Sequence, residues 1–217
     1  MNKLLSIAKT KVGCGYVWGA QGEILTAEKL QQFKNQFGEE YYIFNDGQGE
    51  VDAGKWLGKQ VFDCSGLVVW SLVQLKLLQP GQDYDAEAIF NKLCTPAAKE
   101  KLVPGDLLFI QKPSGIDHVG IYSGNNQVVE AKSTRSGVVE DAVQDGFNVF
   151  GKLNFDLELT GKDILKLLAD AGKLDSLDRW NKAIDVIKSV SDNLGDLSVF
   201  KYTDILIEKI YEFAKYN

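Results

Sequence analysis

The chain has 217 residues, of which 45% are apolar and 25% are charged, a balance typical of a folded protein with a core of its own. Its net charge is -6 and it has no block of Lys and Arg, which argues against nucleic acid as a partner because phosphate binding needs a concentrated basic surface. Three cysteines and one histidine argue against a disulfide framework and against a zinc site, so no metal or cofactor is expected.

The first predicted element is an amphipathic helix over about residues 2–12, which ends near Gly13 and Gly15. Its apolar run at residues 4–8 is too short for the core of a signal peptide. No segment approaches the roughly 20 apolar residues that a membrane-spanning helix needs. We therefore expect a protein made in the cytoplasm, without a signal peptide or membrane span, that would reach a target outside the cell after lysis, by dedicated export or in a virion.

A polar, partly helical excursion is expected next, over residues 16–60, with one helix beginning behind a Thr26 N-cap. A stronger, apolar helix is predicted over residues 64–78, and a further helix over about residues 85–94. After residue 105 the apolar pattern becomes that of strands. These strands are expected at residues 107–110, 118–122, 127–132 and 138–139.

Helices followed by strands predict an α+β fold, in which N-terminal helices pack on an antiparallel sheet. From about residue 160 the apolar residues return to helical spacing in three segments. We therefore predict a first domain over residues 1–158 and a small helical C-terminal module over residues 159–217.

Cys64 is the best candidate for a nucleophile. It follows an apolar, strand-like approach and opens a predicted helix, where the positive end of the backbone dipole favours the thiolate. Its backbone N–H would point outward there and could donate to an oxyanion. A buried, inert thiol is the alternative, since free cysteines are among the most buried residues, and Cys14 and Cys94 fit that alternative better.

His118 is the only imidazole in the chain, so any Cys–His pair must use it. Glu130 lies in the next predicted strand and could fix the orientation and tautomer of the ring. A hairpin loop of three or five residues centred on Gly124 would put His118 directly opposite Glu130 on one face of the sheet. A two-residue loop at Asn125-Asn126 would put them on opposite faces. A triad therefore requires the odd-length loop. Asp117 is a rival partner that should face away, and a merely structural or solvated role is the alternative for the histidine and the glutamate.

Four segments resemble motifs of the NlpC-type cysteine peptidases and occur in that family's order. They are Tyr16-Val17-Trp18-Gly19, Phe62-Asp63-Cys64-Ser65-Gly66-Leu67-Val68, Pro104-Gly105-Asp106-Leu107 and Asp117-His118-Val119-Gly120-Ile121-Tyr122. The resemblance covers about residues 5–155. It implies a papain-like core and an endopeptidase that cuts peptidoglycan stem peptides between D-glutamate, through its side-chain carboxyl, and diaminopimelate or lysine.

The resemblance also assigns roles to individual residues. It implies a triad of Cys64 as nucleophile, His118 as base and Glu130 as third residue. Tyr16 would help to stabilise the oxyanion. Asp63 and Ser65 would hold a free amine of the ligand or shape the pocket, with a structural cap as the alternative for Asp63.

The third residue of the family's triad is often His, Asn or Gln rather than Glu. The glutamate, the segment at residues 128–132 and the long excursion resemble a subset found in phage and prophage lysins. Within the excursion, Tyr41, Tyr42 and Trp56 could line the substrate groove or belong to the core.

Other functions stay open. An amidase of the CHAP type would cut between the sugar and L-alanine with the same cysteine and histidine, and a delivered antibacterial toxin would use the same chemistry. A non-catalytic cell-wall-binding module belongs to a different class. The helical tail could bind the wall or only pack on the first domain. Stem peptides are the expected partner, and the protein is expected to be a monomer.

Overall fold

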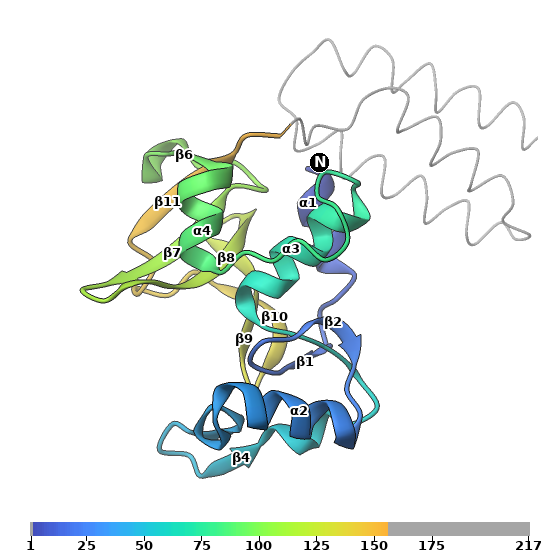
Figure 1. Ribbon diagram of the computed structural model, residues 1–217. Coiled ribbons are helices and arrows are strands. Elements are labelled where there is room, and N and C mark those ends of the chain that lie inside the picture. The colour runs from blue at the N-terminus through green and yellow to red at the C-terminus, as the bar shows by residue number, and fades with distance from the viewer. Residues whose placement is uncertain (1, 156–217) are drawn as a thin grey trace, which may run out of the picture. The chain divides into compact units, whose positions relative to one another are not determined.

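The computed structural model describes residues 2–155, in which helices are combined with an antiparallel sheet (Figure 1). The α+β class predicted from the sequence is confirmed. The predicted helical module at residues 159–217 and the boundary in front of it lie outside the described residues. Within residues 2–155, every helix is too short or too polar to cross a membrane.

The helices differ from the predicted ones mainly at their ends. They are α1 (Lys3–Lys9), α2 (Ala27–Phe37), α3 (Cys64–Gln74) and α4 (Ala86–Ala88), together with the π-helical turn η3 (Ile89–Leu93) and the 3-10 turns η1 (Glu39–Tyr42), η2 (Ala53–Trp56) and η4 (Lys99–Lys101). The helix predicted over residues 85–94 is the pair α4 and η3. α3 stops before residue 78 because Lys76 has a φ of 60°, a left-handed conformation that an α-helix does not contain.

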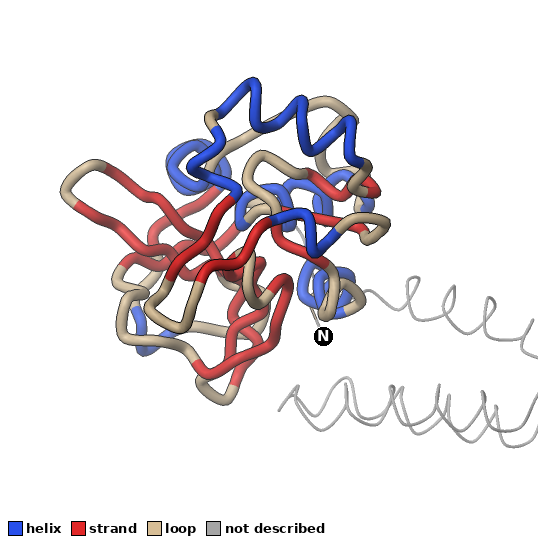
Figure 2. The backbone as a smooth tube through the Cα atoms, turned by 90° about the horizontal axis from the view of Figure 1, so that it is seen from below, coloured by secondary structure: helices blue, strands red, loops and turns tan. Residues whose placement is uncertain are grey.

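The main sheet has six strands in the order β10-β9-β8-β7-β11-β6, and all neighbouring strands are antiparallel. Figure 2 shows the strands of the fold in red and the helices in blue. These strands are β6 (Cys94–Pro96), β7 (Leu107–Lys112), β8 (Gly115–Gly124), β9 (Gln127–Ser133), β10 (Gly137–Ala142) and β11 (Val149–Leu153). A second sheet places β5 (Gln60–Phe62) between β1 (Gly15–Tyr16), to which it is parallel, and β2 (Gln21–Ile24). The hairpin of β3 (Ile43–Asn45) and β4 (Glu50–Asp52) lies in the excursion.

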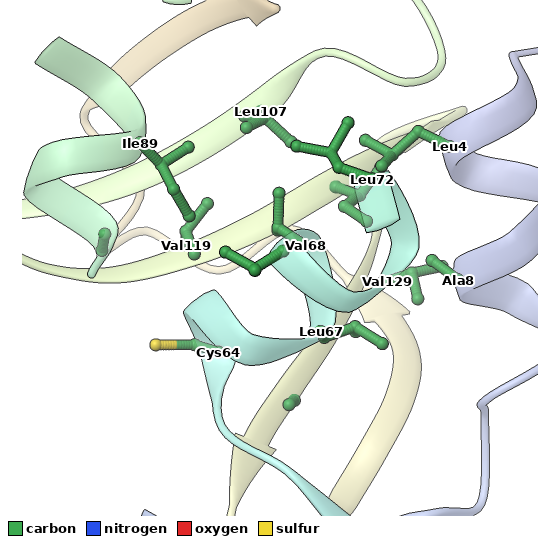
Figure 3. Close-up of a cluster of buried hydrophobic side chains, with 14 of the residues drawn as sticks. Leu4, Ala8, Cys64, Leu67, Val68, Leu72, Ile89, Leu107, Val119 and Val129 are labelled. Carbon is green, nitrogen blue, oxygen red and sulfur yellow. The ribbon is translucent and has the colours of Figure 1, made fainter. Parts of the chain in front are cut away.

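α3 is held on the main sheet by a shared apolar core (Figure 3). Leu67, Val68 and Leu72 of α3 are at most 1% exposed and belong to one cluster with Val119 of β8 and Val129 of β9. Burial of each such side chain stabilises the fold by about 1.5–3 kcal/mol. α1 contacts α3 and the same two strands. The packing fixes the first turn of α3 relative to β8 and β9.

The excursion has a second apolar cluster around α2. Tyr42 is fully buried in it and donates a hydrogen bond from its hydroxyl to the Trp18 carbonyl at 3.2 Å, so it belongs to the core rather than to a groove. Trp56 is half-buried and its Nε1–H binds a backbone carbonyl in the turn that follows β9. Tyr41 is 48% exposed, and its ring stacks on that of Trp18 with a centroid distance of 5.1 Å.

The hairpin of β8 and β9 does not have the loop that the sequence argument required. Its loop is the two-residue turn Asn125-Asn126, and both residues have positive φ values, 50° and 59°, as tight hairpins of this kind favour. The prediction of an odd-length loop is therefore wrong. A regular two-residue hairpin would place His118 and Glu130 on opposite faces.

A β-bulge at Ser123 cancels that effect. Gly124 pairs with Gln127, but Tyr122 pairs with Val128, so β8 uses one residue more than β9 over this step. The extra residue shifts the register by one position for the rest of the hairpin. The histidine of β8 and the glutamate of β9 therefore share a face, as predicted. They are diagonal neighbours rather than directly opposite, because Ile121 pairs with Val129.

Candidate active site

Cys64 is the first residue of α3 and follows directly after β5 and the N-cap Asp63. The extended backbone of Asp63 ends the strand approach, and its Oδ1 accepts the Gly66 N–H at 2.6 Å, so the helix begins at the cysteine. The side chain of Cys64 projects from this first turn at the margin of the core and is 6% exposed (Figure 3). The thiol thus lies at the positive end of the helix dipole, as predicted.

Both carboxylate oxygens of Asp63 have structural roles, Oδ1 as the helix cap and Oδ2 as an acceptor for the preceding turn. Oδ1 also accepts the hydroxyl of Ser65 at 3.0 Å, and Oδ2 accepts the backbone N–H of Gly19 at 2.9 Å. Burial raises the pKa of the Asp63 carboxyl to about 6, against the three hydrogen bonds that act to lower it. Asp63 and Ser65 lie at the helix start as predicted, and their observed contacts are with each other and with the backbone.

His118 of β8 is bound to Glu130 of β9 by a contact of 2.6 Å between Nε2 and Oε2. The two side chains are 16% and 4% exposed. Asp117, the rival partner, forms an ion pair with Lys112 instead. The predicted pairing of the single histidine with Glu130 is therefore present in the structure.

The Cys64 thiol also acts on the charge of the His118 imidazole. Burial disfavours the charged ring and acts to lower its pKa. The hydrogen bonds and charges of Cys64 and Glu130 outweigh burial and raise the pKa of His118 to about 10. The ring is therefore an imidazolium at neutral pH, which is the partner that stabilises a thiolate.

Tyr16 lies in β1 beside Phe62 of β5, next to the start of α3. Burial, followed by the charges of Cys64, Asp63 and Tyr42, raises the pKa of the Tyr16 phenol well above its usual value. The hydroxyl stays protonated over the working range of most proteins and can donate a hydrogen bond. This is the property that an oxyanion-binding group needs.

Some contacts at the site were not predicted from the sequence. The ring of Phe147 lies 5.8 Å from that of His118, centroid to centroid. A side chain at Gly66 would meet the carbonyl of Ala20 at 2.1 Å, so only glycine allows the helix start to approach the turn after Tyr16. Within residues 2–155, no group of three or more His, Cys, Asp and Glu side chains could hold a metal ion.

Residues 46–149 match the NlpC/P60 family, a range that includes Cys64, His118 and Glu130 but not Tyr16. The chain is 38% identical over 95 residues to the probable endopeptidase NlpC of Escherichia coli K12, and the match covers 43% of this chain and 57% of that protein. It is 37% identical over 75 residues to the probable endopeptidase p60 of Listeria grayi, with 35% of this chain and 14% of that protein covered. The chain thus matches little more than half of the first relative's length and a small part of the second.

Solved structures with a similar fold include two proteins of Mycobacterium tuberculosis. The peptidoglycan hydrolase RipB matches with a TM-score of 0.47 and 21% identity, over 70% of this chain and 64% of that one. RipD, a non-catalytic NlpC/p60 domain protein adapted to peptidoglycan binding, matches with a TM-score of 0.46 and 17% identity, over 69% of this chain and 94% of that one.

Proposed function

We propose that the chain, of which residues 46–149 match the NlpC/P60 family, is a cysteine endopeptidase of bacterial peptidoglycan that works through Cys64, His118 and Glu130. The observation that carries the proposal is the surroundings of the one histidine, which is bound to the buried carboxylate of β9 and whose pKa is raised by that carboxylate and by the cysteine at the start of α3. A merely structural cysteine would not need an imidazolium beside it.

The proposed chemistry starts from a thiolate and an imidazolium. The thiolate of Cys64 attacks the carbonyl carbon of the scissile amide, and the imidazolium of His118 gives its proton to the leaving nitrogen as the C–N bond breaks. A water then attacks the thioester and gives a proton to the now neutral imidazole, the C–S bond breaks, and thiolate and imidazolium are restored. Glu130 holds the ring in orientation throughout.

The charge that develops on the carbonyl oxygen needs donors. The backbone N–H of Cys64, in the first turn of α3, has no partner within the helix, and the pKa of the Tyr16 phenol is raised in part by the charge of Cys64. Together they would form the oxyanion hole. Asp63 would act by fixing the helix start rather than by touching the ligand, with Ser65 beside it at the rim.

The proposed bond joins D-glutamate, through its side-chain carboxyl, to diaminopimelate or lysine. The resemblance of the motifs around Cys64 and His118 suggests this bond, and the relatives named as probable endopeptidases support an endopeptidase over an amidase. The rival amidase would cut before L-alanine with the same residues, and a wall-binding module would bind without turnover. The same proposal includes three further points: a likeness to phage lysins, a monomeric state, and action on the cell wall. The protein would reach the wall after lysis, by dedicated export or in a virion.

The test is to incubate wild type, Cys64→Ala and Cys94→Ala with purified peptidoglycan and with free stem peptides, and to identify the products by mass spectrometry. Cys94 is a matched control because it is a second buried cysteine outside the site. We expect fragments split after D-glutamate from wild type and Cys94→Ala and none from Cys64→Ala. Fragments split before L-alanine would establish the amidase, and wall binding without any cleavage would establish the binding module.

A further inference from the structure

Glu130 has one carboxylate oxygen without an assigned partner. Oε2 binds His118, whereas Oε1 is buried and accepts no hydrogen bond from the described residues. The side chain as a whole is 4% exposed. An ion pair in such surroundings is strong only as long as water stays out, because the low dielectric strengthens the attraction and water would weaken it.

Phe147 is the side chain placed to keep water out. It belongs to the segment at residues 143–148 between β10 and β11, in which Gln144, Asp145 and Gly146 are exposed while Phe147 is 6% exposed. Its ring packs with Leu108 and Val128 and lies against the imidazole, with an angle of 41° between the two planes. A lone aromatic ring is thus inserted from a polar loop onto the face that holds the His118–Glu130 pair.

The segment is anchored at both ends, so the ring is fixed in place. The Val143 N–H donates to the Asn126 carbonyl at 2.9 Å, and the Asn148 N–H donates to the Phe109 carbonyl at 3.0 Å. The Asn148 side chain binds the backbone of Gln111 in the manner of a neighbouring strand, through two bonds of 2.8 Å and 3.0 Å.

Gly120 borders both partners of this arrangement. A Cβ atom there would lie 3.4 Å from Phe147 Cζ and 3.4 Å from Glu130 Cβ, and it would clash with a methyl group of Val128 at 2.5 Å. The ring of Phe147 and the side chain of Glu130 thus both lie over the backbone of β8 at this glycine.

We propose that Phe147 is a positioning residue, which seals the His118–Glu130 pair from water and holds the imidazole toward Cys64. Its role in turnover rests on the proposed function, while its role in sealing the pair does not. The ionisable groups that act on His118 are Cys64 of α3 and Glu130 of β9. Asp117 of β8 is paired with Lys112, and Asp145 of the sealing segment is exposed.

The chain has one histidine, so an NMR titration of its imidazole protons reports on His118 without interference. In wild type we expect a midpoint near pH 10, in line with a pKa raised to about 10. Water entry relieves the burial that lowers this pKa and weakens the effects of Cys64 and Glu130 that raise it. Because the raising effects are larger in sum, Phe147→Ala should move the midpoint toward 6.5, by about one unit. Phe147→Met, which refills much of the space, should restore most of the difference.

Phe150→Ala is the matched control. Phe150 belongs to the same apolar cluster, and it packs there without a ring contact to His118. We expect this variant to leave the midpoint unchanged, and Phe147→Ala to lower kcat on stem peptides by about tenfold at nearly constant KM. If Phe147→Ala does not fold, Phe147→Leu takes its place, with a shift in the same direction.

The outcomes separate the two proposals. An unchanged midpoint in a folded Phe147 variant, or an equal shift in Phe150→Ala, would overturn the sealing role whether or not the protein cuts peptidoglycan. A lowered midpoint in a protein that cuts nothing would support the sealing role and refute the proposed function.

Discussion

Replacement of Glu130 by Gln tests whether the charge of this residue, rather than its shape, sets the pH range of the site. The amide keeps the size of the side chain and an oxygen acceptor for Nε2 of His118, and it removes the negative charge. In the wild type, burial acts to lower the pKa of His118, but contacts with Cys64 and Glu130 raise it to about 10.

The expected shift follows from the distance. Loss of an opposite charge at hydrogen-bonding distance lowers a histidine pKa by about 1–3 units, which places it near 8 in Glu130→Gln. Because the folded-state pKa lies above the ordinary value of 6.5, the charged ring contributes stability that is fully present below about pH 6.5 and is lost as the pH rises through about 10. In the variant this loss, and the alkaline limit of hydrolysis, should both move to about pH 8. The hydrolysis rate at pH 9 should therefore fall about tenfold, with little change near pH 6.5.

The assay is the rate of stem-peptide cleavage as a function of pH, with the NMR titration of the single histidine beside it. Glu140→Gln is the control, because Glu140 is a carboxylate of the neighbouring strand β10 that binds Lys9 and Ser123 rather than the imidazole. The cleavage rate of Glu130→Gln could still fall only near pH 10, or the fall could move equally in Glu140→Gln. Either result would show that the charge of Glu130 does not raise the pKa of His118.

Two further substitutions test the start of α3 and its surroundings. Tyr16→Phe keeps the ring and removes the hydroxyl, so kcat on stem peptides should fall by about a hundredfold with KM nearly constant in steady-state kinetics; an unchanged kcat would remove Tyr16 from the oxyanion hole. Gly66→Ala would place a methyl group 2.1 Å from the Ala20 carbonyl, and because the obstacle is backbone, urea denaturation should show a free energy of unfolding lower by about 2–3 kcal/mol. Wild-type stability in that variant would mean that the helix and the turn before it are not in contact.

The start of α3 was predictable because its signals are local. Asp63 is a strong N-cap residue, and the apolar run behind it has no alternative to a buried helix. The premature end of α3 was not predictable, because the left-handed conformation of Lys76 lacks a signal in its residue type.

The pairing of His118 with Glu130 was predicted from the number of residues in the hairpin, which decides whether two side chains lie on the same face of the sheet. The contact is present, although the loop length assumed for it is wrong. Asn125-Asn126 carried the local signal for a tight turn, and that signal was correct. The bulge at Ser123 had no such signal, since an ordinary serine can occupy either a regular or a bulged position.

Phe147 was missed for a different reason. Its contact with His118 joins segments that are distant in sequence, and no periodicity links a loop residue to a strand residue. A single aromatic side chain among Gln144, Asp145, Gly146 and Asn148 is the clue that the sequence did contain, because such a ring rarely stays in water.

The bulge at Ser123 makes the proposed triad dependent on whether the number of residues in this hairpin is odd or even. Removal or insertion of one residue between His118 and Glu130 would turn the carboxylate to the far side of the sheet, unless a second change of one residue compensated for it. Length changes of two would preserve the alignment. In related sequences, gaps in this hairpin should therefore occur in pairs, and a single gap would mark a protein that has lost the third residue or recruited another.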